Sequence, residues 1–152
     1  MSKSNATEND YVKFEANAVA MPAYGASLQI NLHTDDPGEG GIATTNLPTY
    51  ASYVAQTVPR DSSGLTICDG LSPYAANPSG SGYKNTAQVT FPEYETEFSG
   101  TETIKYVSMS VIATGQILRK AQLGTAALPA PRIFAAGGTP FFPGGTLIFA
   151  ED

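Results

Sequence analysis

Residues 28–33 read Leu-Gln-Ile-Asn-Leu-His, and in this stretch apolar side chains alternate with polar ones. This period of two is typical of a β-strand with one face buried and the other in solvent. Residues 34–41 follow with Thr-Asp-Asp-Pro-Gly-Glu-Gly-Gly. Aspartate closes Asx turns, proline fixes φ and glycine permits positive φ, so this segment predicts a sharp turn. A strand ending in such a turn favours an antiparallel β fold.

The same alternation of apolar stretches and turn residues continues along the chain. Residues 101–113 carry apolar side chains on both parities, which predicts a strand covered on both faces. Residues 69–83 are rich in Gly, Pro and Ser and predict a long loop, a feature usually reserved for function or partner contact. About seven to nine short strands predict an all-β fold, a jelly-roll-like antiparallel β-sandwich. The other strands are expected within residues 50–58, 65–68, 87–91, 116–123 and 146–149.

The first ten residues are polar and show no hydrophobic period. We therefore expect residues 1–14 to form a flexible, extended N-terminal arm that orders on binding a partner, with a short strand at Tyr11–Phe14. Tyr11 and Phe14 are its candidate contact residues. Residues 15–152 are expected to form a single β-sandwich domain, because 152 residues is an ordinary single-domain length.

The composition excludes several classes of protein. Charged residues make up 14% of the chain, with 8 Lys and Arg against 14 Asp and Glu, so the clustered cationic face of a nucleic-acid-binding protein is not expected. The single cysteine, Cys68, excludes an intrachain disulfide and a thiolate zinc site. No apolar stretch is long enough for a membrane span or resembles a secretory signal. We expect a protein that is made in the cytoplasm and binds neither nucleic acid nor membrane.

Motifs of the common enzyme classes are also missing. The chain contains no Gly-x-Ser-x-Gly, no phosphate-binding Gly-x-x-x-x-Gly-Lys and no dinucleotide-binding glycine pattern before a helix. Its one histidine, His33, would have to serve any histidine-dependent mechanism. We therefore expect no enzymatic activity, no catalytic residue and no cofactor.

The turn after the first clear strand holds a weak candidate metal site. Asp35, Asp36 and Glu39 offer the oxygen ligands that calcium prefers, and His33 lies close by in sequence. The spacing does not match an EF-hand loop, and Asp-Pro-Gly is first of all a turn signal. We favour the turn interpretation. His33 falls on the polar parity of its strand, so we expect it to be a hydrogen-bonding group at the surface or at an interface.

Glu93, Glu95 and Glu97 alternate with Tyr, Thr and Phe residues. In an extended chain such carboxylates lie roughly 6.5–7 Å apart, which resembles the spacing of a glycosidase pair. Neighbouring carboxylates on one exposed strand face lack the desolvation and the opposed geometry of that chemistry. We therefore favour an acidic stripe exposed to solvent. The remaining alternative is that these three glutamates contact a basic surface on a partner, which keeps them as candidate contact residues.

Aromatic residues gather near the C-terminus, where Phe141 and Phe142 are adjacent. In a strand one of the two must point away from the core, and an outward phenylalanine suggests a contact surface. Both residues are therefore candidate partner contacts.

Five segments together carry a family resemblance. They resemble, in order, the signature segments of small virion structural proteins of tailed bacteriophages, described as tail-fibre-like or as head decoration (cement) proteins. Asp35 and Gly138 depart from that pattern, where the family has Ala and Asp. The resemblance implies a β-sandwich that assembles on a virion, and it implies no catalytic residues. The segments are Leu-Gln-Ile-Asn-Leu-His-Thr-Asp-Asp-Pro-Gly-Glu-Gly-Gly at 28–41, Tyr-Ala-Ser-Tyr-Val-Ala at 50–55, Ala-Gln-Val-Thr-Phe-Pro at 87–92, Ala-Thr-Gly-Gln-Ile-Leu at 113–118, and Gly-Gly-Thr-Pro-Phe-Phe-Pro-Gly-Gly-Thr-Leu at 137–147.

Our leading functional expectation is a capsid decoration protein. The chain is short and has no coiled-coil heptads, which favours a compact clamp on the head over a free-standing fibre. Such a protein would bind the outer surface of the major capsid protein, form a homotrimer and stabilise the head, after synthesis in the host cytoplasm. The alternative is a tail-associated structural protein, either a tail fibre or a receptor-binding or adaptor module. A third hypothesis is a small enzyme or carbohydrate-binding module that uses His33 and its neighbouring carboxylates.

Overall fold

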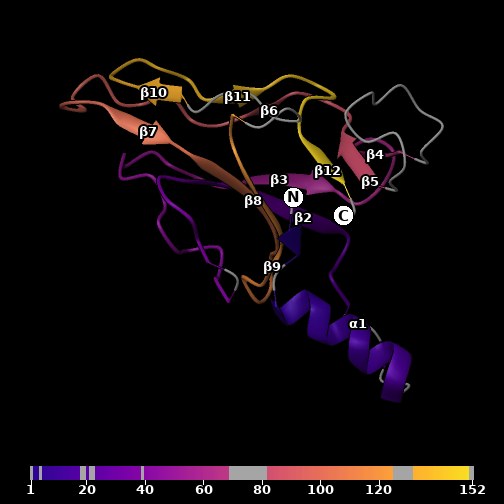
Figure 1. Ribbon diagram of the computed structural model, residues 1–152. Coiled ribbons are helices and arrows are strands. Elements are labelled where there is room, and N and C mark those ends of the chain that lie inside the picture. The colour runs from indigo at the N-terminus through magenta and orange to yellow at the C-terminus, as the bar shows by residue number, and fades with distance from the viewer. Residues whose placement is uncertain are drawn as a thin grey trace.

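The described part of the chain is mostly antiparallel β-sheet, as the sequence predicts, and also contains one helix (Figure 1). No helix in the described part of the chain is long and apolar enough to cross a membrane. The computed structural model describes residues 2–3, 5–17, 20, 23–38, 40–68, 82–124 and 132–150.

The largest sheet has five antiparallel strands with β8 at its centre. Leu28 of β2 lies opposite Val111 of β8, and Val107 of β8 lies opposite Ala121 of β9. A bulge between Met109 and Ser110 shifts the register of β8 against β9. In order across the sheet the strands are β1 (Ser2–Lys3), β9 (Ile117–Gln122), β8 (Tyr106–Val111), β2 (Ser27–His33) and β3 (Gln56–Pro59).

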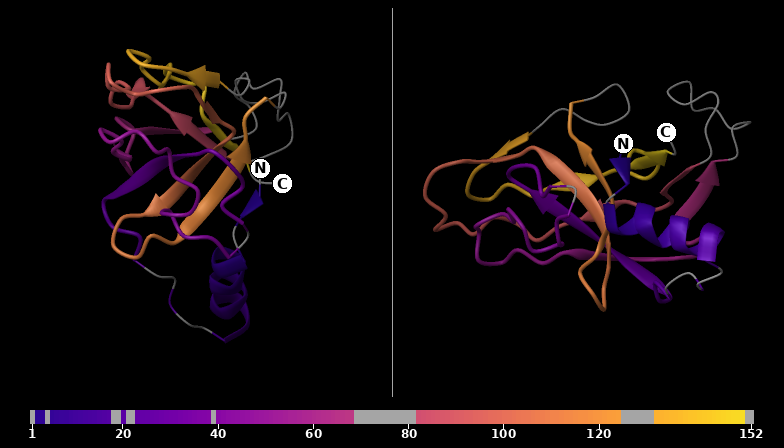
Figure 2. Two further views of the ribbon diagram at one scale, coloured as in Figure 1. Left: turned by 90° about the vertical axis from the view of Figure 1, so that its left-hand side faces the viewer. Right: turned by 60° about the horizontal axis from the view of Figure 1, so that its bottom comes forward.

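Smaller antiparallel sheets make up the opposite layer of the sandwich (Figures 1 and 2). One has three strands, in the order β12, β5 and β4, and the others are the pairs β11 with β6 and β10 with β7. Their bounds are β4 (Leu65–Cys68), β5 (Gly82–Asn85), β6 (Val89–Thr90), β7 (Glu102–Ile104), β10 (Arg132–Phe134), β11 (Phe141–Phe142) and β12 (Ile148–Ala150).

The core lies between these layers and combines β-branched and aliphatic residues with large rings. Ile30, Met109 and Phe149 are completely buried, although they come from three separate strands. Edge-to-face packing joins Phe91 to Phe142 across 6.3 Å between ring centroids. Large flat side chains supply much apolar area per residue, so a chain with few aliphatic residues still forms a dense core.

Several strand predictions are confirmed, and others differ in extent or in exposure. β4 covers residues 65–68 as expected. β8 is buried on both faces as expected, but the single strand predicted over residues 101–113 is divided into β7 and β8, which belong to different sheets. The strand expected within residues 50–58 begins only at Gln56, because Tyr53 N–H donates to the Tyr50 carbonyl at 3.1 Å in a turn. β2 was expected to expose its polar face to solvent, but the side chains on that face are buried or half-buried as well.

The N-terminal segment corrects the sequence interpretation most clearly. Residues 5–17 form helix α1 (Asn5–Asn17), so the strand expected at Tyr11–Phe14 is wrong and this part of the arm is helical rather than extended. The segment contains no Pro or Gly, which would disfavour a helix. The negative charge of Glu8 in the first turn also stabilises the helix, because it lies at the positive end of the helix dipole. The division of the chain into an arm of residues 1–14 and a domain of residues 15–152 stays a prediction.

Candidate functional site

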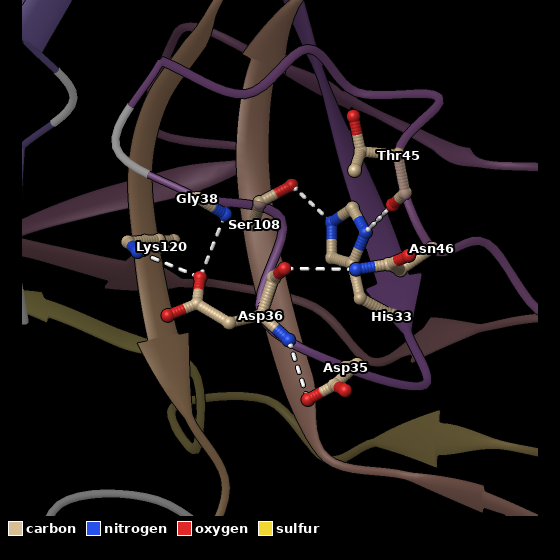
Figure 3. Close-up of polar contacts among 8 residues, drawn as sticks. All are labelled: His33, Asp35, Asp36, Gly38, Thr45, Asn46, Ser108 and Lys120. Atoms are coloured by element: carbon tan, nitrogen blue, oxygen red, sulfur yellow. Dashed lines mark hydrogen bonds and ion pairs between the residues drawn. The ribbon is translucent and has the colours of Figure 1, made fainter.

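The outer face of the five-stranded sheet carries a buried polar cluster beneath the loop of residues 34–46 (Figure 3). His33 is completely buried there. Its Nδ1 lies 2.7 Å from the Thr45 carbonyl and its Nε2 lies 2.7 Å from Ser108 Oγ. A carbonyl can only accept, so Nδ1 carries the proton, and the Ser108 hydroxyl donates to Nε2 of the neutral ring. The cluster therefore joins β2, β8 and the covering loop.

Burial lowers the pKa of His33, against smaller opposing effects of the Thr45 hydrogen bond and the Asp36 charge. The expectation of a surface or interface histidine is therefore wrong. The period-two pattern places His33 correctly on the outer face of the strand, but the returning loop covers that face. A general base must reach its substrate, so a neutral imidazole with both nitrogens bonded inside the protein is suited to structure rather than catalysis.

Asp36 organises the turn that covers His33. Gly38 N–H donates to Asp36 Oδ1 at 2.8 Å, which closes an Asx turn, and Gly38 itself has φ of +83°. Lys120 Nζ lies 2.7 Å from the same oxygen, and the Lys120 side chain is only 8% exposed. This hydrogen bond is the largest cause of the lowered pKa of Asp36. Asp36 therefore ties the turn to β9, and the predicted turn chemistry is confirmed.

The candidate metal site gains no support from this geometry. Asp35 accepts a hydrogen bond from Asp36 N–H at 3.0 Å and lies 4.0 Å from Lys105 Nζ, while Asp36 is bonded to Lys120. Glu39 lies outside the described residues. Within the described ranges, no three His, Cys, Asp or Glu side chains are placed to hold a metal ion.

The acidic stripe is not a strand face. Residues 91–98 contain no strand, and Phe98 N–H donates to the Glu95 carbonyl in a turn. Glu93 and Glu97 are exposed, whereas the Glu95 carboxylate accepts a hydrogen bond from the Ser52 amide. The regular carboxylate spacing expected from an extended chain therefore does not apply. Contact of these glutamates with a partner stays a prediction.

Glu102 carries the contacts that the sequence pattern did not reveal. Its carboxylate accepts hydrogen bonds from Tyr94 Oη at 2.9 Å and from both the amide and the hydroxyl of Thr49, at 2.9 and 3.0 Å. The Tyr94 ring stacks on Tyr50 with centroids 3.8 Å apart. No local motif marks Glu102, because its partners lie far from it in sequence or in an irregular segment.

The other candidate contact residues divide by exposure. Tyr11, Phe14 and Phe141 are 39%, 52% and 40% exposed, which makes them accessible to a partner. Phe142 is 5% exposed and packs in the core, so it is corrected from contact residue to core residue. The prediction that one member of this pair points outward is confirmed. Most of the loop 69–83 lies outside the described residues.

Comparison with protein families matches residues 2–150 to the family described as podophage GP4 fiber I protein gp80. The chain belongs to this family. No curated protein matches it. The gp80 match covers almost the whole chain, so this is a structural protein of the bacteriophage virion, as the sequence resemblance implied. The fibre description fits the tail-associated alternative better than the capsid-decoration expectation, for which the match adds nothing.

Proposed function

We propose that this gp80-family chain is a non-enzymatic structural subunit of the phage tail, either a fibre subunit or an adaptor at the fibre base. The observation that carries the proposal is the match of residues 2–150 to a fibre protein family. The fibre description of the family supports a tail-associated role, and we give it more weight than the absence of heptads, which only argued against a free-standing coiled-coil fibre.

The geometry of the polar residues supports a structural role. His33, Asp36 and Glu102 all use their side chains to join separate segments of the same chain. Such contacts stabilise loops around a rigid body, which is what a load-bearing assembly component requires. Contact with the major capsid protein and a homotrimeric state remain predictions of the decoration hypothesis.

Immunogold electron microscopy of purified virions tests the proposed location. Antibodies raised against the folded chain should label the tail or its fibres, while antibodies against the major capsid protein label the head as a control. Quantitative mass spectrometry should find far fewer copies of this chain than of the major capsid protein. Gold distributed over the whole head, with copy numbers comparable to the capsid protein, would overturn the proposal, as would absence from the virion.

A further inference from the structure

A cavity of about 530 Å³ lies beside α1, between the five-stranded sheet and the opposite layer. Leu28 of β2 and Leu118 of β9 line it and are 3% and 6% exposed, so they form an apolar floor. Leu65 of β4 lines it from the opposite layer. We call this space the α1 cavity. Its volume is within the range of roughly 300–1,000 Å³ that is typical of small-molecule binding sites.

Two tyrosine rings in the walls of the α1 cavity are held in place by arginines. The Arg119 guanidinium lies 5.8 Å from the centroid of the Tyr83 ring and donates a hydrogen bond to the hydroxyl of that ring. The Arg60 guanidinium lies 5.6 Å from the Tyr24 centroid, and its Nη1 donates to the Gly25 carbonyl at 2.7 Å. Rings that are already fixed lose little conformational entropy when a ligand packs against them.

Polar groups stand at the mouth of the α1 cavity. The consecutive residues Arg60, Asp61 and Ser62 line it and are exposed, whereas the leucine floor is buried. A guanidinium has five N–H donors, and Arg60 gives one of them to the Gly25 carbonyl. The Asp61 carboxylate accepts from the amide and the hydroxyl of Ser63, and a carboxylate has about four acceptor positions. The mouth therefore offers a ligand both donors and acceptors.

A sugar ring matches both parts of this lining. Its C–H groups form an apolar face of weak positive polarity, which packs on the negative face of an aromatic ring. Its hydroxyls both donate and accept, so they use acceptors as well as donors of the protein. Acids disfavour an anionic ligand here, because Asp61 stands at the mouth and the pKa of Tyr24 is raised by burial and by the nearby charge of Asp10. The lining therefore favours a neutral sugar.

We propose that the α1 cavity is a binding site for a neutral saccharide. The sugar ring packs against Tyr24 and Tyr83 above the leucine floor, and its hydroxyls form hydrogen bonds with residues 60–62 at the mouth. Such a site adds a binding activity to the structural role proposed above. It does not depend on where in the virion the chain resides.

Saturation-transfer NMR of the full chain tests the class of ligand. The neutral probes are the methyl glycosides of glucose, galactose, mannose and N-acetylglucosamine, together with maltose and lactose. The anionic probes are N-acetylneuraminic acid and adenosine monophosphate. At least one neutral probe should receive saturation and bind with a dissociation constant in the millimolar range or tighter. The proposal is overturned if no neutral probe binds, and equally if an anionic probe binds more tightly than every neutral one.

A blocking variant tests whether the bound sugar occupies the α1 cavity. Ser62→Trp places a large side chain at the mouth and should weaken binding of that sugar by about tenfold or more. Ile133→Trp is the matched control, because Ile133 is 68% exposed on β10, lies outside the lining and should leave binding unchanged. Both positions are exposed, so the fold should tolerate the added ring. Undiminished binding by Ser62→Trp would place the sugar elsewhere and overturn the proposal.

A second pair of variants tests the hydrogen bonds at the mouth. Asp61→Asn keeps an oxygen for the turn but removes the charge, and should weaken sugar binding by about two- to fivefold, since bonds to ionised groups are the stronger ones. Asp35→Asn is the control, because Asp35 is also exposed and bonded within a turn but does not line the cavity. Equal affinities of the two variants for the sugar would contradict the contact assigned to Asp61 and overturn the site as described.

Discussion

At the scale of single residues, a charged lysine is held almost entirely out of water. Lys120 is 8% exposed in its side chain, and Asp36 supplies a carboxylate oxygen 2.7 Å from its ammonium group. Burial of a charge is tolerated when it is paired and hydrogen-bonded. The Asp36 side chain is 45% exposed, so solvent screens part of its attraction to Lys120.

Asp36→Asn should lower the free energy of unfolding by about 1–2 kcal/mol, because it removes the charge while keeping an oxygen that accepts from Gly38 N–H. Asp35→Asn is the matched control, since Asp35 is 70% exposed and lies 4.0 Å from Lys105. It should change the stability by less than about 0.5 kcal/mol. Urea unfolding of both variants measures the difference, and equal losses would contradict the role assigned to Asp36.

The lowered pKa of His33 predicts a pH dependence of stability. Above its ordinary pKa of 6.5 the ring is neutral in both states, and no pH dependence arises from it. As the pH falls below 6.5 the unfolded chain binds the proton first, so the folded state loses stability until the pH passes the lower folded pKa. The chain has one histidine, so this window belongs to His33. The carboxylate of Asp36, whose pKa is lowered from 3.8, acts only at more acidic pH.

His33→Gln should therefore make the free energy of unfolding less dependent on pH between pH 6.5 and the more acidic range in which Asp36 titrates. This holds whatever the effect of the substitution on stability at neutral pH. Chemical unfolding of the wild type and the variant at a series of pH values measures the two slopes. An unchanged slope in the variant would show that His33 does not titrate as its burial requires.

At the scale of elements, β8 is the central strand of the larger layer. It pairs with β2 and β9 in the centre of the five-stranded sheet and is buried on both faces. The sequence predicted burial on both faces, but the second face of β8 is made by the buried Ser108 and Ser110, whereas Ile112 is exposed. Helix α1 was missed for the opposite reason: its sequence has almost no hydrophobic period, and a sequence pattern detects an element only when one face is selected for packing.

Met109→Ala in β8 should destabilise the protein by about 2–5 kcal/mol, because Met109 is completely buried and its truncation leaves a cavity in the core. Ile133→Ala, at a position that is 68% exposed, should cost less than about 0.5 kcal/mol. Thermal and urea unfolding of the pair provide the comparison. A small effect at Met109 would mean that the layers repack freely around β8.

At the scale of the whole molecule, stability is distributed unevenly. The sandwich buries its core between two layers, while the second half of α1 is exposed. Local opening free energies follow the number of buried apolar contacts, so these two regions should differ strongly.

Hydrogen exchange of a dilute sample should therefore show rapid exchange of amides in residues 11–17 and the slowest exchange in β8. Equal protection of α1 and β8 in the dilute sample would contradict the uneven distribution.

By itself, the sequence determined the all-β antiparallel class, the positions of strands such as β4 and the turn chemistry around Asp36, because alternation and turn propensity act between near neighbours. The family resemblance of residues 28–149 also led to the correct broad class, a structural protein of the bacteriophage virion. Only the tertiary structure decided that His33 is buried and that Glu102, rather than the acidic stripe, joins distant segments. It also decided that α1 lines a cavity together with residues of both layers. Those outcomes depend on which chain segment returns to cover which face, and such long-range packing leaves no periodic signal in the sequence.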